Sequence, residues 1–145
     1  MGRTLAFDIG EKRTGAAITD ELYITAQPVG VRERVGYKSE VAWVLDLMKE
    51  YNIERIVVGH PVGLSGERGE RALACESVAK KLAEALQLEV VLWDERLTTA
   101  EADRMMKDAG VSRKKRKKSV DRIAAQLILT GWLASGGRET HGTGK

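Results

Sequence analysis

The sequence contains little cysteine and histidine: one cysteine, Cys75, and two histidines among 145 residues. A single cysteine cannot form a disulfide within the chain, and its spacing with Val78 and Leu82 places it on the apolar face of a predicted helix. So few histidines and cysteines form no cluster of the ligands that zinc selects. A chain of this length buries about two thirds of its unfolded surface, so we expect a hydrophobic core to hold the fold without cross-links.

Long apolar segments are also absent. No stretch reaches the roughly 18 consecutive apolar residues of a membrane-spanning helix. Asp8 interrupts the N-terminal segment where a signal peptide needs an unbroken apolar run, and Ala6 stands where a myristoylation signal needs Ser or Thr. No GxxxxGK pattern occurs, which argues against a P-loop ATPase. We therefore expect a cytoplasmic protein that does not bind membranes.

The composition is that of one ordinary globular domain. The hydrophobic fraction is 43% and the charged fraction 31%, both near the average for soluble proteins. No internal repeat or linker divides the chain. We expect residues 1–135 to form a single domain and residues 136–145, which contain almost nothing to bury, to form a disordered tail.

Hydrophobic periodicity predicts an α/β fold. The predicted strands are 3–10, 14–19, 22–29, 54–59 and 89–93, and the predicted helices are 38–51, 70–86, 98–110 and one that Ser119 caps. The first two strands should form an antiparallel hairpin, and the helix over 38–51 should make strand 54–59 parallel to the first. Pro28 favours an edge position for its strand. Residues 30–36 and the glycine-rich residues 60–69 are expected to form loops.

Positive charge is concentrated in one segment. The net charge is +3, but removing six adjacent cations from the 24 basic residues leaves 18 against 21 acidic residues. Because adjacent cations repel one another, the run favours a polyanion partner over a solvated loop without a partner. We predict that the run and the turn of the first hairpin bind nucleic-acid phosphates through Lys12, Arg13, Arg113, Lys114, Lys115, Arg116, Lys117 and Lys118.

Three carboxylates stand where side chains leave the predicted core. Asp8 ends the first strand, Glu95 follows the strand over 89–93, and Asp121 falls in the first turn of the last predicted helix. Small Ala124 and Ala125 would let that helix approach the sheet closely. Three converging anions repel one another strongly without a cation. These oxygen ligands therefore predict magnesium, with manganese as an alternative, and two ions about 4 Å apart could assist phosphodiester hydrolysis.

Each of these carboxylates also has a purely structural interpretation. Asp8 could cap a turn, and Asp121 could be an ordinary acidic residue at a helix start. Glu95 could pair with Arg96 or Arg104. Their joint placement favours the metal site over these alternatives.

Other polar residues are weaker candidates. Turn and capping roles explain Asp20 and Asp94 adequately. His60 at a strand exit could assist proton transfer, but a single histidine at such a place is more often structural.

Four sequence blocks resemble the YqgF family, also called RuvX. They are 8–15 (DIGEKRTG), 57–61 (VVGHP), 93–99 (WDERLTT) and 112–121 (SRKKRKKSVD), the last followed by 124–125 (AA) and 128–129 (IL). The resemblance implies a ribonuclease H-like, RuvC-like fold: three layers, a mixed five-stranded sheet with an antiparallel N-terminal hairpin, and helices on both faces. It also implies that Asp8, Glu95 and Asp121 match the family's acidic catalytic positions.

The same resemblance implies an activity. The family is associated with nuclease action that matures the 5′ end of the 16S ribosomal RNA precursor and leaves a 5′-phosphate and a 3′-hydroxyl. It was first proposed to resolve Holliday junctions, so branched DNA is the alternative substrate. The expected partners are therefore precursor ribosomal RNA or branched DNA and the ribosomal small subunit, with the chain as a monomer or a homodimer.

The sequence departs from the family pattern at two places. His60 stands where the family usually has an apolar residue, and Glu67 and Arg68 replace a small polar and an acidic residue, which leaves substrate contacts from this loop open.

Two rival functions also remain. The Asp-x-Gly hairpin resembles the phosphate loop of actin-like ATPases and sugar kinases, but those proteins need two lobes. The basic run alone would suit an RNA- or ribosome-binding module without turnover.

Overall fold

The elements follow the α/β order that the sequence predicts. The computed structural model describes residues 2–61, 66, 68–94 and 113–137, with the backbone alone for 113–122. The strands are β1 (Arg3–Ile9), β2 (Arg13–Thr19), β3 (Ala26–Glu33), β4 (Ile53–His60) and β5 (Glu89–Asp94), and the helices are α1 (Tyr37–Leu47), α2 (Glu70–Leu86) and α4 (Arg113–Ala134). The helix expected over 98–110 and the tail from 138 onward lie outside the described residues.

The described strands form one mixed sheet in the order β3-β2-β1-β4-β5. β1 pairs antiparallel with β2 and parallel with β4, and β4 pairs parallel with β5. The predicted hairpin, the parallel crossover and the edge position of the strand that holds Pro28 are therefore confirmed. Because β1, β4 and β5 run in one direction, their carboxyl ends meet at the same edge of the sheet.

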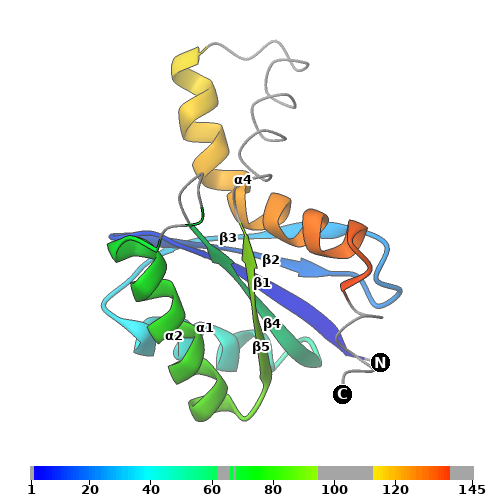
Figure 1. Ribbon diagram of the computed structural model, residues 1–145. Coiled ribbons are helices and arrows are strands. Elements are labelled where there is room, and N and C mark those ends of the chain that lie inside the picture. Colours follow the sequence, from blue (N-terminus) through cyan, green and yellow to red (C-terminus); the bar gives the residue numbers. More distant parts are fainter. Residues whose placement is uncertain (1, 62–65, 67, 95–112, 138–145) are drawn as a thin grey trace.

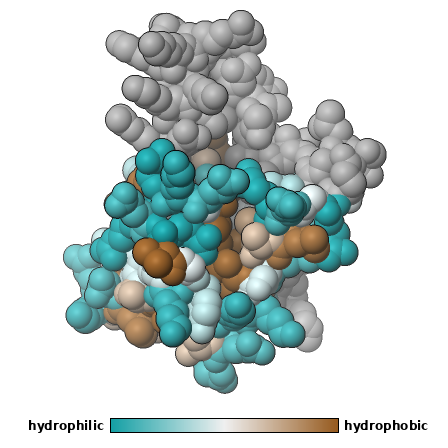
Figure 2. All heavy atoms as spheres, turned by 90° about the vertical axis from the view of Figure 1, so that its left-hand side faces the viewer, coloured by the Kyte–Doolittle hydropathy of each residue, from teal (hydrophilic) through white to brown (hydrophobic). Residues whose placement is uncertain are grey.

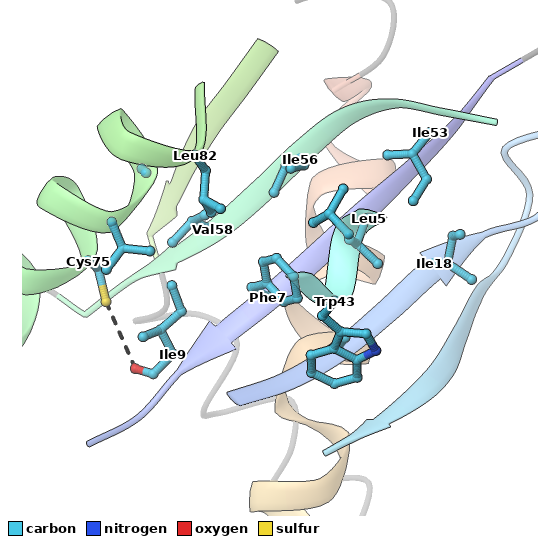
Figure 3. Packing of buried hydrophobic residues seen from close by; sticks show 14 residues of the cluster. Leu5, Phe7, Ile9, Ile18, Trp43, Ile53, Ile56, Val58, Cys75 and Leu82 are labelled. Carbon is cyan, nitrogen blue, oxygen red and sulfur yellow. Dashed lines mark hydrogen bonds between the residues drawn. The ribbon is translucent and has the colours of Figure 1, made fainter. Parts of the chain in front are cut away.

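Helices cover both faces of this sheet (Figure 1). Successive residues of a strand point to opposite faces, and β1 is apolar on both. Leu5, Phe7 and Ile9 belong to the core on the side of α1 and α2, where the rings of Phe7 and Trp43 lie 5.8 Å apart (Figure 3). The central strand therefore holds the three layers together.

The core on the α4 side is built with small residues at its centre. Ala6 and Ala17 of the sheet face Ala125 of α4, with Ile128, Leu129 and Trp132 packed around them. The short side chains let the α4 backbone approach the sheet, as predicted for this helix. Trp132 is fully buried and is a core residue.

The third strand lies later in the chain than predicted. The Asp20 carboxylate accepts hydrogen bonds from the backbone N–H groups of Leu22, Ile24 and Thr25, so these residues form a turn although two of them are apolar. β3 continues through residues 30–33, which the sequence predicted as a loop. Gly30 has a φ of 151° beside a β-bulge at Val29, and charged residues are tolerated because this is an edge strand.

Two helix ends also differ from prediction. α1 ends at Leu47, because the N–H groups of Lys49 and Glu50 bond to carbonyls three residues earlier and tighten the chain into turns. α4 begins at Arg113, so the basic run is helical and not a loop, and Ser119 does not cap the helix. Lysine and arginine are strong helix formers, and like charges one turn apart destabilise a helix by only about 0.2–0.5 kcal/mol per pair.

The surface shows no single large apolar patch on the face drawn in Figure 2. Hydrophilic residues cover most of that face, and hydrophobic residues appear as separate spots between them. Exposed apolar residues scattered in this way are normal for a soluble surface. Within the described residues, no helix is both long and apolar enough to cross a membrane.

The two-sided core makes a stability prediction. Leu82 of α2 is fully buried, so Leu82→Ala should lower the free energy of unfolding by about 2–5 kcal/mol through lost contacts and a cavity. Leu73 on the same helix is 49% exposed, and Leu73→Ala should change it by less than about 0.5 kcal/mol. Urea denaturation measures both, and equal losses would contradict this packing.

Candidate active site

Asp8 lies near the carboxyl end of the central strand, between two buried apolar residues. Its register partner on β2 is Gly15, which has no side chain to cover it. The Asp8 side chain is 19% exposed, and the alternation along β1 directs it to the α4 face, as for Ala6. Asp8 therefore places a carboxylate at the edge of the sheet, where a cation from solvent can reach it.

Arg71, in the first turn of α2, is a charged neighbour of Asp8 that the sequence analysis missed. Its Nη2 lies 4.0 Å from Asp8 Oδ1 and donates a hydrogen bond of 3.0 Å to the backbone oxygen of Ile9. More than sixty positions separate the two residues in the sequence, and no local pattern signals the contact. Only the packing of α2 against the end of β1 brings them together.

The structure describes only the backbone of one of the other two predicted ligands and does not describe the second. Glu95 follows directly after Asp94, the last residue of β5, but lies outside the described residues. Asp121 belongs to α4, of which this part is described by its backbone alone. It lies inside the helix and not in the first turn, where the sequence analysis had placed it. Among described side chains, no three potential ligands form a metal site. The three-carboxylate cluster therefore stays a prediction.

The placement of α4 is nevertheless consistent with that cluster. α4 packs against the face of β1 to which Asp8 points, through Ala125 and its neighbours. Figure 1 shows the later part of α4 lying over the sheet and its first part, which holds residues 113–118, extending beyond the sheet. The basic run and Asp121 therefore belong to one continuous helix.

Lys12 and Arg13 lie exposed in and after the turn between β1 and β2, at the same edge as Asp8.

A buried carboxylate on α1 stabilises this turn. Glu40 is 1% exposed and accepts hydrogen bonds from Thr14 Oγ1 (2.8 Å) and from Nε and Nη2 of Arg34 (3.1 and 3.0 Å). The backbone N–H of Arg34 in turn donates a hydrogen bond to the backbone carbonyl of Lys12. A satisfied buried pair of this kind fixes the local backbone.

His60 ends β4 and faces α2, on the opposite side of the sheet from Asp8. Its Nε2 lies 2.7 Å from Glu76 Oε2, and Arg68 donates two hydrogen bonds to the same carboxylate, at 2.8 and 2.7 Å. Arg68 first, and His60 second, lower the pKa of Glu76 to about 2. These contacts favour the structural interpretation of His60.

The weaker carboxylate candidates also have places in the fold. Asp20 caps the turn before β3, and the backbone N–H of Thr25, followed by those of Ile24 and Leu22, lowers its pKa. Its predicted turn role is confirmed. Asp94 ends β5, and its register partner on β4 is His60.

The sequence matches a known protein family and several named relatives. Residues 2–135 match the family model described as "RuvX: Holliday junction resolvase". The chain is 47% identical to a Bacillus cytotoxicus protein named "Putative pre-16S rRNA nuclease", over 92% of this chain and 98% of the relative. It is 40% identical to a Syntrophomonas wolfei protein of the same name, over 92% and 95% of the two chains.

Two solved structures share the fold. One is T. thermophilus RuvC in complex with a Holliday junction substrate, with a TM-score of 0.52, 14% identity, and coverage of 94% of this chain and 98% of RuvC. The other is the fowlpox virus Holliday junction resolvase, with a TM-score of 0.50, 16% identity, and coverage of 92% and 99%. They confirm the predicted ribonuclease H-like, RuvC-like fold.

The interactions of Glu76 predict a pH dependence of stability. Because folding lowers the pKa of Glu76 from 4.5 to about 2, its ionised form stabilises the fold above pH 4.5, and this contribution is lost as the pH falls from 4.5 through 2. The loss of unfolding free energy on Glu76→Gln should therefore be larger near pH 5 than near pH 3. Urea titrations at both pH values measure it. Glu84→Gln, at an exposed site on the same helix, should show no such difference.

Proposed function

This chain belongs to the RuvX family, and we propose that it is a magnesium-dependent nuclease that hydrolyses phosphodiester bonds of precursor 16S ribosomal RNA at its 5′ end. The names of its relatives support the substrate. The observation that carries the activity is Asp8, a partly exposed carboxylate at the end of the central strand, on the face covered by α4. A cytoplasmic location is part of the proposal.

The described part of the site fits a hard divalent cation. Asp8 supplies a carboxylate oxygen, the ligand type that magnesium and manganese prefer, and we propose Glu95 and Asp121 as the other ligands. When bound, the metal would lower the pKa of a water molecule and stabilise negative charge on the leaving oxygen. Asp8 is held by a strand paired on both sides, which gives its carboxylate a defined direction.

The basic residues supply affinity. Lys12 and Arg13 lie in and after the turn that follows β1, at the same edge of the sheet as Asp8, and residues 113–118 lie on the helix that carries Asp121. If the phosphates of one RNA strand bind at both places, that RNA strand passes Asp8 between the two contacts. Such contacts give salt-dependent affinity with little choice of base sequence. The selection of a cleavage site must therefore come from the shape of the RNA.

Branched DNA is the alternative substrate, favoured by the description of the family model. A panel of single-stranded RNA, a structured ribosomal precursor and a four-way DNA junction separates the two. We expect the structured precursor to be cleaved with the highest kcat/KM. Faster cleavage of the junction would favour a resolvase, and binding without magnesium-dependent cleavage of any substrate would leave only a binding module.

Removing the Asp8 charge should abolish turnover. Asp8→Asn should lower kcat by more than about 100-fold, since losing even an outer partner of a metal ligand typically costs 10–100-fold. Cleavage of the precursor RNA is measured in magnesium and in EDTA. Asp46→Asn makes the same change at a 52% exposed position on α1 and should retain wild-type kcat. Equal activity of the two variants would exclude Asp8 from the site.

Neutralising the basic run should reduce the salt dependence of binding. If Lys114, Lys115, Lys117 and Lys118 each contact a phosphate, their change to Gln should reduce the slope of log K against log salt by about 0.7 per residue on single-stranded RNA. A matched variant changes Lys38, Lys49, Lys80 and Lys81, which lie exposed on α1, α2 and the turn after α1. Its net charge is identical, so equal slopes in the two variants would remove the run from the interface.

A further inference from the structure

Arg71 occupies a position that the mechanism above does not use. It lies in the first turn of α2, with its Nη2 4.0 Å from Asp8 Oδ1, and its side chain is 50% exposed. Resting on the proposed nuclease function, we propose that Arg71 binds a non-bridging oxygen of the substrate phosphate beside Asp8. We also assign it the positioning of the backbone that carries Asp8.

The positioning role follows from the Ile9 carbonyl. Arg71 Nη2 donates to this oxygen at 3.0 Å, and the thiol of Cys75 lies 3.9 Å from it (Figure 3). Residues 71 and 75 are four apart and therefore share one face of α2. Two side chains of one helix thus hold the peptide unit between Ile9 and Gly10, one residue beyond Asp8.

The binding role follows from the hydrogen-bonding capacity that Arg71 retains. A guanidinium has five N–H donors in a planar fork that matches phosphate geometry. Within the described residues, the polar partners of Arg71 are the Ile9 carbonyl and, beyond hydrogen-bond distance, the Asp8 carboxylate. Since the side chain is half exposed, its other N–H groups can bind an anion that arrives from solvent.

A second arginine close by makes the contrast clear. Arg68 is 56% exposed, but its Nε and Nη2 both donate to Glu76. Its charge is paired with a carboxylate of α2, the helix that begins two residues after it. Arg71 has no such bidentate carboxylate among the described residues, so it is the better phosphate ligand of the two.

The positive charge of Arg71 favours a phosphate beside Asp8 and disfavours a metal ion there. A cation this close to Asp8 repels a divalent ion and weakens its binding, because like charges interact strongly in a partly buried site. The same cation stabilises the negative charge that a phosphate develops during hydrolysis. Loss of Arg71 should therefore tighten magnesium binding while it slows cleavage, a combination that a purely structural residue would not produce.

The first experiment measures binding without turnover. Arg71→Ala, Arg71→Lys and the control Lys80→Ala are titrated with a precursor-like RNA in EDTA at several salt concentrations. Lys80 is exposed on the same helix, nine residues further on. Arg71→Ala should reduce the salt slope by about 0.7 for a single strand, and Arg71→Lys and Lys80→Ala should keep the wild-type slope. An unchanged slope in Arg71→Ala would overturn the phosphate contact.

The second experiment measures cleavage as a function of magnesium. Arg71→Ala should lower kcat on the order of 100-fold, the cost of losing one donor to a developing charge, and should lower the half-saturating magnesium concentration. Arg71→Lys should restore only part of kcat, because it keeps the charge and loses the fork. Wild-type kcat in Arg71→Ala, or weaker magnesium binding, would overturn the proposal.

The two proposals fail in different ways. If the wild-type protein cleaves no substrate, the nuclease function fails, while the titrations in EDTA still decide whether Arg71 contacts a phosphate. If the wild type cleaves and Asp8→Asn does not, but Arg71→Ala behaves as Lys80→Ala in both experiments, the role of Arg71 fails and the nuclease function stands. Urea denaturation of each variant separates loss of folding from loss of contact.

Discussion

The structure depends on a central strand that is buried on both faces and carries a carboxylate near its carboxyl end. β1 pairs with β2 and β4 and packs against α1 and α2 on one side and α4 on the other. Its rigidity gives Asp8 a defined position, because the neighbouring residues Phe7 and Ile9 are fixed in the core. The strength of the core and the precision of the candidate site therefore have the same physical origin.

Several polar contacts hold the backbone around this carboxylate. Arg71 and Cys75 contact the Ile9 carbonyl from α2, while buried Glu40 ties Thr14 of the hairpin to α1. These contacts come from different elements and converge on the end of β1. Groups held in this way favour the placement of a substrate phosphate by preorganised contacts over rearrangement.

The distribution of charge agrees with a nucleic-acid substrate. The six cations of residues 113–118 outweigh the slight negative balance of the remaining chain, and α4 carries them as a helical extension of the segment that packs on the sheet. A helix is stiffer than the loop that the sequence predicted. Figure 1 shows that α4 changes direction between this extension and the part that lies over β1.

The sequence by itself determined the elements with strong periodicity, such as the helix over 70–86, the hairpin and the parallel crossover, because their hydrophobic patterns are local. It misplaced β3, since the capping of a turn by Asp20 overrides the apolar character of Leu22 and Ile24. It predicted Asp8 as a site residue from the end of an apolar run, and the structure places this carboxylate, partly exposed, near the end of β1. Only the tertiary structure decided that Arg71 lies beside it and that His60 pairs with Glu76, because contacts between distant segments leave no periodic signal in the chain.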